Sequence, residues 1–446
     1  MGASASGSGS GTLGILKNRN FARLFSAGAT SVAGFAIGQV ALTWIVWSNT
    51  ASAIDVAYIG VAFILASVIF SLAAGALVDR HERRRLMVLS DLVRAGTLAG
   101  LVIATYTVGF SLAVILVVAF VLGSFTTLFQ PAERALTPEV VGSEQLANAN
   151  ALVQTSNSVL QFTANTAGAA IIAAVGVVAA FGLNTLTFLV SASLITGITG
   201  VAVAKKPEPG AAVKHPSMVE DIRDGFRYIT RNRALLELTL SAGIANFFLS
   251  MFFQFFVVYA SVELGGGVLE YGLLQGLFAL GWAPGAYLSA KYRAVRYAGL
   301  LWIVAGVLVG LSILAMVILP YLAPALLFSF VAGVLLGLTN TTWLTAVQLI
   351  VPTEMQGRYF GLDQLGSFAV IPVGQVVGGV IIAASSVGTD FLVAGVGTAA
   401  ASGLFVLSPY LRNLGWKQPV EETKTGSAGG GTIAPLEGGI RTHESR

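Results

Sequence analysis

The chain has 446 residues, of which 55% are hydrophobic and only 10% are charged. Because a soluble domain carries about 25% charged residues, this composition excludes a soluble enzyme. The chain has no cysteine, which excludes disulfides, thiolate metal sites and cysteine nucleophiles. Its net charge is +4, and the positions of the charged residues along the chain decide what this charge means.

Twelve apolar runs follow one another along the chain, and each is long enough to cross the hydrocarbon core of a membrane as a helix. Six lie at residues 24–48, 56–77, 87–107, 110–130, 149–175 and 180–204. Six more lie at residues 234–260, 270–290, 299–320, 325–350, 359–384 and 389–408. We therefore predict an all-α integral membrane protein with twelve transmembrane helices, arranged as two six-helix bundles.

The remaining segments divide the chain. The Gly/Ser-rich residues 1–16 and the polar residues 412–446 are predicted to be disordered tails. The two bundles then cover residues 17–204 and 234–411, joined by a linker at 205–233. In the linker, a Ser-x-x-Glu capping box at Ser217 is followed by apolar residues on one helical face, namely Met218, Ile222, Phe226 and Ile229. This pattern predicts an amphipathic helix at the membrane surface, or one packed on the underside of the protein.

The basic residues indicate the orientation. All 25 Lys and Arg residues fall in the two tails, in the linker or in loops on the same side of the predicted helices. Such residues collect on the cytoplasmic side, so we expect both termini to be cytoplasmic and the protein to reside in the cytoplasmic membrane. The opposite loops contain acids that we expect to be solvated, namely Asp55, Glu263, Glu270 and Asp390.

The two halves resemble each other when the chain is shifted by 210 residues. The shift places Gly75 on Gly285, Arg83 on Arg293, Gln154 on Gln364, Asn165 on Gln375 and Gly168 on Gly378. One offset that aligns polar residues inside two apolar segments predicts a parallel repeat, with helix 5 equivalent to helix 11.

The loop after the second helix reads Gly75-Ala76-Leu77-Val78-Asp79-Arg80-His81-Glu82-Arg83-Arg84-Arg85. It resembles the signature Gly-x-Leu-x-Asp-Arg-x-Gly-Arg-Arg of the major facilitator superfamily, with Glu82 where the signature has Gly. Residues 131–138, 146–151 and 224–229 resemble the macrolide-efflux and enterobactin-exporter branch. This resemblance implies the major facilitator fold, in which two pseudo-symmetric bundles open a central site to alternate sides of the membrane.

The resemblance also implies a conformational switch at this loop. Its expected members are Gly75, Asp79, Arg80, Arg83, Arg84, Asp91, Arg94, Glu133 and Arg134. Asp79 is expected to engage the start of helix 11, and Glu133 and Arg134 to pair with the loop cluster. Asp91 and Arg94 are three residues apart on one helix and are expected to form an ion pair.

Polar side chains inside apolar helices are costly in lipid, so they are expected to face a pathway or another helix. The pathway candidates are Gln39, Gln154, Asn157, Gln161, Asn165, Asn246, Gln254, Asn340, Trp343, Gln364 and Gln375. The alternative for each of them is a hydrogen bond between helices.

The chemistry of the chain narrows its function. His81, His215 and His443 all fall in cytoplasmic segments, and the acids within helices lie near the cytoplasmic ends, so we expect no metal site and no cofactor. There is no nucleotide-binding Gly-rich Lys motif, and we expect neither enzymatic activity nor a nucleic-acid partner. The lack of charged groups deep within the helices favours a neutral or amphiphilic substrate, and we expect a monomer. The branch implies proton-coupled efflux of a drug-like or siderophore-like molecule. The alternative is an importer or facilitator of a small neutral metabolite.

Overall fold

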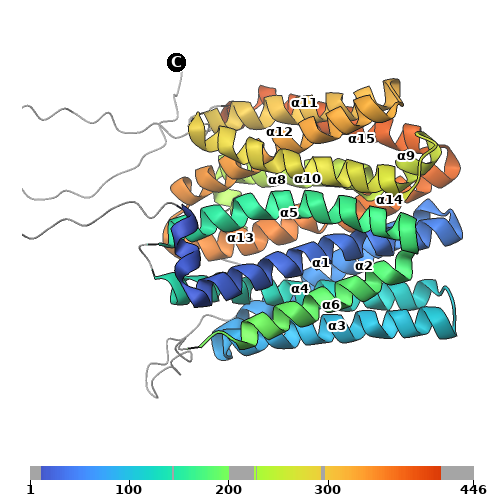
Figure 1. Ribbon diagram of the computed structural model, residues 1–446. Coiled ribbons are helices and arrows are strands. Elements are labelled where there is room, and N and C mark those ends of the chain that lie inside the picture. Colours follow the sequence, from blue (N-terminus) through green and yellow to red (C-terminus); the bar gives the residue numbers. More distant parts are fainter. Residues whose placement is uncertain (1–11, 143–144, 200–225, 228, 293–296, 413–446) are drawn as a thin grey trace, which may run out of the picture. The chain divides into compact units, whose positions relative to one another are not determined.

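The computed structural model describes residues 12–142, 145–199, 226–227, 229–292 and 297–412, and Figure 1 shows the arrangement of their helices. The first half comprises η1 (Thr12–Lys17), α1 (Arg19–Thr50), α2 (Ala53–Arg80), α3 (Arg83–Thr107), α4 (Leu112–Val141), α5 (Leu146–Val175) and α6 (Val177–Thr196). The second comprises α8 (Arg233–Gln254), α9 (Phe256–Val262), α10 (Val268–Lys291), α11 (Ala298–Ile318), α12 (Leu322–Ile350), α13 (Thr353–Phe368), α14 (Ile371–Ala384), α15 (Val387–Leu404), η3 (Phe405–Leu407) and α16 (Pro409–Arg412). The only regular secondary structure in the described residues is helical, as the apolar runs predict.

Within the described residues, eleven helical segments are long and apolar enough to cross a membrane. The α10 helix occupies the place of the remaining predicted crossing and is 24 residues long. It is less apolar because Gln275, Pro284 and four glycines interrupt its apolar residues, in addition to Glu270 in its first turn and Lys291 in its last turn. It packs between α5 and α12, so protein rather than lipid covers much of its surface.

Close packing of α10 on α12 depends on glycines in both helices. Gly281 and Gly285 face the backbone of α12, while Gly333 and Gly337 face the backbone of α10. A methyl group on Gly281 would lie 2.9 Å from the backbone nitrogen of Val334. Spacings of four residues between small side chains let helix backbones approach within a membrane, where dispersion forces rather than the hydrophobic effect hold helices together.

Three predicted helix boundaries are wrong. The predicted run 110–130 stops just before Pro131, whereas α4 continues through Pro131 and Pro138 to Val141. The predicted run 234–260 is divided into α8 and α9 at Phe255. The predicted run 359–384 is divided into α13 and α14, with Pro372 in the first turn of α14. In this last case the proline, which has no backbone N–H, starts a new helix.

The helix ends form two sets. One set carries Arg23, Arg84, Arg134, Arg233 and Lys291, and we call it the basic end; it lies on the left in Figure 1. The other set holds the α1–α2, α5–α6, α9–α10 and α14–α15 connections, and we call it the opposite end.

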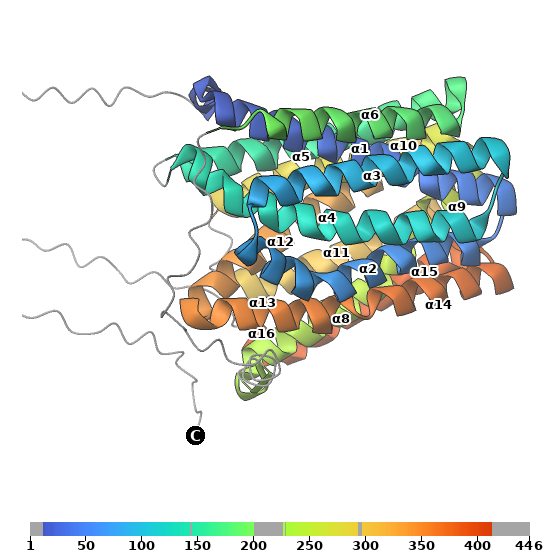
Figure 2. The same cartoon turned by 90° about the horizontal axis from the view of Figure 1, so that it is seen from below.

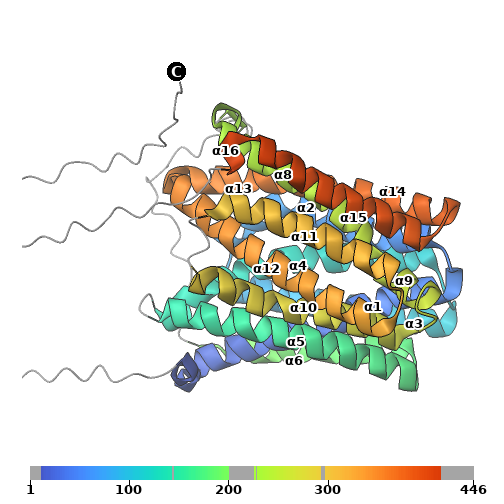
Figure 3. The same cartoon turned by 90° about the horizontal axis from the view of Figure 1, so that it is seen from above.

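The two halves contact each other mainly through two helix pairs, α5 with α10 and α2 with α14. Figure 3 shows α5 beside α10, and Figure 2 shows α2 in the layer next to α14. The predicted repeat equates helices 5 and 11, and helices 2 and 8, so the two pairs are equivalent under it. The pseudo-symmetry expected from the 210-residue offset is therefore present in the packing.

The contacts between the halves are closest toward the opposite end. A methyl group on Gly272 of α10 would lie 2.8 Å from the carbonyl oxygen of Asn165 on α5. A methyl group on Gly379 of α14 would lie 3.2 Å from the carbonyl oxygen of Ala53 on α2. The hydrogen bond from Gln254 to Val56 also joins the two halves at the opposite end.

Several predictions fall on residues outside this description. They include most of the tails at 1–16 and 412–446 and most of the linker at 205–233. Of the predicted amphipathic face, Ile229 is buried against Leu235 and Leu238, whereas Phe226 is exposed.

Candidate functional site

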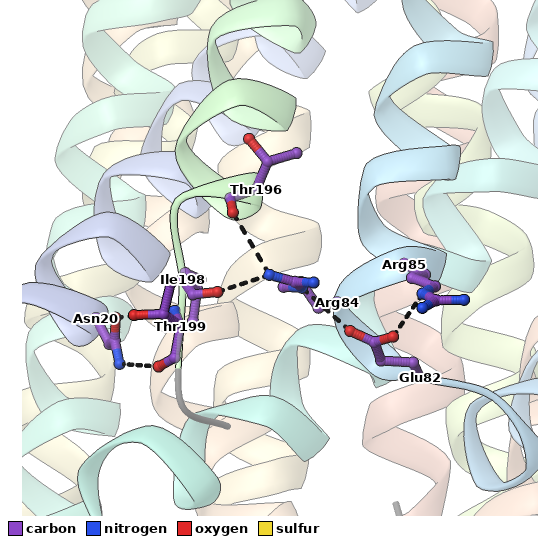
Figure 4. Close-up of polar contacts among 7 residues, drawn as sticks. All are labelled: Asn20, Glu82, Arg84, Arg85, Thr196, Ile198 and Thr199. Carbon is purple, nitrogen blue, oxygen red and sulfur yellow. Dashed lines mark hydrogen bonds and ion pairs between the residues drawn. The ribbon is translucent and has the colours of Figure 1, made fainter. Parts of the chain in front are cut away.

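The loop between α2 and α3 is held to the end of α6 by Arg84, as Figure 4 shows. Arg84 Nη1 donates to the carbonyl oxygen of Ile198 over 2.8 Å, and Arg84 Nε donates to Glu82 Oε1 over 3.1 Å. The other carboxylate oxygen of Glu82 lies 2.5 Å from Arg85 Nε. Glu82, the residue that departs from the family signature, thus orients the arginine that caps α6.

The same helix end is tied to α1. Asn20 Nδ2 donates to the carbonyl oxygen of Thr199 over 2.7 Å, and Arg23 Nη1 donates to that of Gly197. The C-terminal carbonyls of α6 therefore receive donors from both α1 and the signature loop.

Arg83 pairs with a different acid from the one that the sequence indicated. Its guanidinium contacts Glu139 of α4 and also donates to the carbonyl oxygen of Ala135 over 3.3 Å. Because α4 extends to Val141, Glu139 is the α4 acid level with the loop. Within the expected cluster, Arg83 thus pairs with Glu139 and not with Glu133, and the pairing of Glu133 and Arg134 with Asp79 and Arg80 stays a prediction. The side chains of Gly75, Asp79 and Arg80 lie outside the described residues.

A buried ion pair lies inside the first half. Arg94 Nη2 is 2.5 Å from Asp91 Oδ1, and both side chains are at most 2% exposed, which confirms the predicted pair. The guanidinium lies over the rings of Phe129 and Phe188, with centroids 4.6 and 4.3 Å away. Stacking on two rings and pairing with a carboxylate together compensate for the removal of Arg94 from water.

Glu133 lies close to this pair. The Glu133 carboxylate contacts Gly28 of α1, and a methyl group on Gly28 would overlap this carboxylate. Arg94 and Arg134 are close enough to interact electrostatically with Glu133. Asp91, Arg94 and Glu133 thus place two carboxylates and one guanidinium between α1, α3 and α4. Arg134 itself is exposed.

The predicted polar face of α5 is turned toward the second half. Gln154, Asn157, Gln161 and Asn165 follow at helical spacing, and the Asn165 backbone contacts Gly272 of α10. Asn165 is 9% exposed, whereas Gln161 and Gln154, nearer the basic end, are exposed. At the level of Gln161, the neighbouring residue Phe162 still contacts Gly276 of α10, while the amide side chains of Gln161 and Gln154 are uncovered. Asn340 on α12 is exposed as well, and Gln39 and Asn157 are half-buried.

Two other pathway candidates close the opposite end. Gln254 Nε2 donates to the carbonyl oxygen of Val56 on α2 over 2.6 Å, and Gln375 Nε2 donates to Gln254 Oε1 over 3.1 Å. Both amides lie against Gly60, where a methyl group would be 2.5 Å from Gln375 Nε2. This Gln254–Gln375 bridge joins α8 and α14 to α2.

Asn246 and Trp343 make contacts within the second half. Asn246 Nδ2 donates over 2.8 Å to the carbonyl oxygen of Ser367, next to the break between α13 and α14. Trp343 packs in an apolar cluster with Val347 and Tyr359 and is hydrogen-bonded to Tyr359. For these two residues the alternative of interhelical bonding holds. The side chain of Gln364 lies outside the described residues.

Asp390 is not a solvated loop residue, contrary to the prediction. It lies in the first turn of α15 and is 0% exposed, and neither carboxylate oxygen has a hydrogen-bond partner in the described structure. The apolar run was set to begin at 389, but Ser386 caps the helix earlier and brings Asp390 inside the bundle.

The sequence reading also missed contacts that close the opposite end. Tyr271 of α10 is hydrogen-bonded to Thr43 of α1, and Gly272 and Gly276 fit against α5. The spacing of Gly272 and Gly276 by four residues is a signal that was available. The contact at Gly60 could not be predicted from a repeating pattern, because it depends on Gln254 and Gln375, which lie far along the chain.

Residues 10–418 match the family described as transmembrane secretion effector. The match covers most of the chain, and the chain belongs to this family of the major facilitator superfamily.

Curated relatives are distant but cover nearly the whole chain. Macrolide efflux protein A of Streptococcus pyogenes is 24% identical over 383 residues, which is 84% of this chain and 92% of that protein. The multidrug efflux pump Tap of Mycolicibacterium fortuitum is 25% identical and covers 88% of this chain and 96% of its own. The transporter YvqJ of Bacillus subtilis, named as an uncharacterized MFS-type transporter, is 24% identical over 85% of this chain and 89% of its own.

Solved structures share the fold. The nucleoside transporter NupG superposes with a TM-score of 0.70 at 10% identity, over 87% of this chain and 99% of its own. A POT family transporter in complex with 5-aminolevulinic acid gives a TM-score of 0.71 at 10% identity, over 88% and 97%. Its membership of the transmembrane secretion effector family makes the protein a multi-pass membrane transporter and not an enzyme.

Proposed function

We propose that this transporter exports a neutral or amphiphilic, drug-like or siderophore-like molecule in exchange for protons. The basic end is assigned to the cytoplasm, with both termini there, because Lys and Arg collect on that side. The efflux names carried by macrolide efflux protein A and the pump Tap support the direction.

One observation carries the mechanism. The contacts of Gly272 and Gly276 with α5, of Gly379 with α2 and of Gln254 with Val56 join the halves toward the opposite end, whereas the α5 amides Gln161 and Gln154 are exposed. We take the halves to meet at the opposite end and to part toward the basic end. With the basic end cytoplasmic, this arrangement is the inward-facing state of an alternating-access cycle. The uncovered amides Gln154, Gln161 and Asn340 offer donors and acceptors without net charge, which suits an uncharged or amphiphilic substrate.

The same cycle assigns roles to the two ends. The Gln254–Gln375 bridge and the glycine contacts break when the protein opens outward. The signature loop, fixed on α6 by Arg84, moves with the first half as a rigid unit. The coupling proton needs a titratable group within the helices. The described candidates include the Asp91–Arg94–Glu133 cluster, Asp390, and Asp363, which is buried on α13 and accepts hydrogen bonds from Thr239 and Ser367.

The test is the accumulation of a panel of fluorescent lipophilic compounds in cells that produce the protein, with and without a protonophore. Lower accumulation that the protonophore abolishes supports proton-driven efflux. Accumulation that rises, or a panel in which no compound responds, favours the second candidate, a carrier for a small neutral metabolite. Asp79→Asn serves as the paired variant and is expected to lower transport without lowering the amount of protein in the membrane.

A further inference from the structure

Asp390 is a buried acid without a partner. Its carboxylate lies against α14, where a methyl group on Gly378 would be 2.8 Å from Asp390 Oδ1. The side chains around Gly378 are apolar, with Phe255 Cε2 at 2.6 Å and Met251 Cβ at 3.4 Å from the same methyl position. Both carboxylate oxygens are without hydrogen-bond partners among the described residues.

The helices around α15 offer Asp390 no cation. It packs against α8, α9, α11, α14 and η3, and neither α11, α14 nor η3 contains a titratable residue. On α8 the charged residues are Arg233 and Glu237, both at the basic end. On α9 the titratable residue is Tyr259, whose hydroxyl donates to the carbonyl oxygen of Met316 over 2.8 Å. Glu263, which follows α9 directly, lies beside Gly388. An ionised carboxylate is very costly in such surroundings, whereas a protonated one is tolerated.

The carboxyl group lies directly behind the contact that closes the opposite end. Gly378 faces Asp390, and its neighbour Gly379 faces Ala53 and Ile54 of α2. One turn away on α14, Gln375 forms the bridge to Gln254. The same helix, α14, therefore contacts both Asp390 and the residues that join the two halves, so a movement of α14 changes both sets of contacts.

We propose that Asp390 is a proton-binding site at the outer end of the transporter, and that the proton bound there is required for α14 to close against α2. When the halves separate at this end, α14 loses its support on α2 and shifts against α15, so that water reaches the carboxyl group and the proton is released to the outer medium. When the site is protonated again from that medium, the closed arrangement forms. This inference rests on the alternating-access cycle of the proposed function and adds the group through which external protons act on it.

Linkage sets the size of the effect. If the closed state holds one proton more than the open state, the closed-to-open ratio falls by up to ten-fold for each unit of rising pH. The ratio changes most between the pH values at which the two states lose that proton.

The chain has no cysteine, so distance reporters can be attached without background labelling. Asn49 and Ser385 are exposed near the opposite end, in the first and second halves respectively. We suggest cysteines at these two positions, spin labels on both, and distance measurements in lipid nanodiscs from about pH 5 to about pH 9, without substrate or gradient. The variants are Asp390→Asn, which mimics the protonated group, and Glu263→Gln as the matched control, since Glu263 is only half-buried.

We expect a short distance at low pH and a growing population of long distances as the pH rises in the parent protein and in Glu263→Gln. Asp390→Asn should keep the short distance throughout. If Asp390→Asn does not fold, Asp390→Ser replaces it, because its side chain is smaller and does not titrate. A parent protein without pH response, or an Asp390 variant that responds like the parent, overturns the proposal. Neither result bears on efflux in cells, so the two proposals fail separately.

Discussion

Gly272 provides the sharpest test of how the halves meet. A methyl group there would overlap Ala169 Cβ and lie 2.8 Å from the carbonyl oxygen of Asn165, both on α5. Overpacking of this kind costs about 1–3 kcal/mol. The contact exists only where the halves meet, so in Gly272→Ala the cost falls on the closed arrangement and is relieved when the halves separate. The ratio of closed to open molecules should therefore fall by about 5- to 150-fold.

Two matched glycine variants separate this effect from general damage. Gly96 of α3 has no other atom within 4 Å of a methyl group placed on it, so Gly96→Ala should leave both stability and conformation unchanged. Gly281 faces α12 of its own half, so Gly281→Ala should lower the free energy of unfolding in every conformation. Gly272→Ala alone should shift the equilibrium.

The assay is the population of short and long distances between spin labels at Asn49 and Ser385, together with unfolding monitored by circular dichroism. For Gly272→Ala we expect more long distances and little loss of helical stability. If Gly272→Ala matches Gly96→Ala in its distances, or destabilises the fold as Gly281→Ala does without shifting them, the argument from inter-half contact is refuted.

Further predictions concern the other contacts. Arg94→Met leaves Asp91 buried without its cation, so the free energy of unfolding should fall by about 3–5 kcal/mol; a loss below 1 kcal/mol, measured by chemical unfolding in detergent, would contradict the buried pair. Arg84→Ala should speed backbone hydrogen exchange at residues 196–199 while lowering overall stability by less than about 1 kcal/mol, because the contact is near the surface; unchanged exchange would show that Arg84 does not cap α6. Gln254→Leu removes the hydrogen bond to Val56, worth about 0.5–1.5 kcal/mol net, and should raise the share of long distances in the spin-label assay; an unaltered distribution would exclude the bridge as a closure.

Local features of the sequence predicted much of what the structure contains. The pair Asp91 and Arg94 is formed within one helix, so its spacing of three residues was sufficient to predict it. The offset of 210 residues predicted the equivalent contacts of α5 with α10 and of α2 with α14. The polar face of α5 was also visible from spacing alone, because it repeats at the helical period.

The partners of other residues come from distant segments. Gln254 and Gln375 follow the alternative of hydrogen bonding between helices, because they bond to each other and to Val56, which the spacing along the chain does not reveal. Glu139 pairs with Arg83 because α4 runs on past Pro131, which a sequence pattern reads as a helix end.

The sequence by itself determined that this chain is a helical membrane protein with two repeated halves, and it identified the superfamily through the signature loop. These properties depend on apolar length, charge placement and local motifs, all of which act along the chain. Only the tertiary structure decided which end is closed, which polar groups join the halves, and that the Asp390 carboxylate is enclosed without a hydrogen-bond partner in the described part of the chain. Such features depend on which backbone faces touch, and the free energy of a buried polar group is set by neighbours that sequence distance does not reveal.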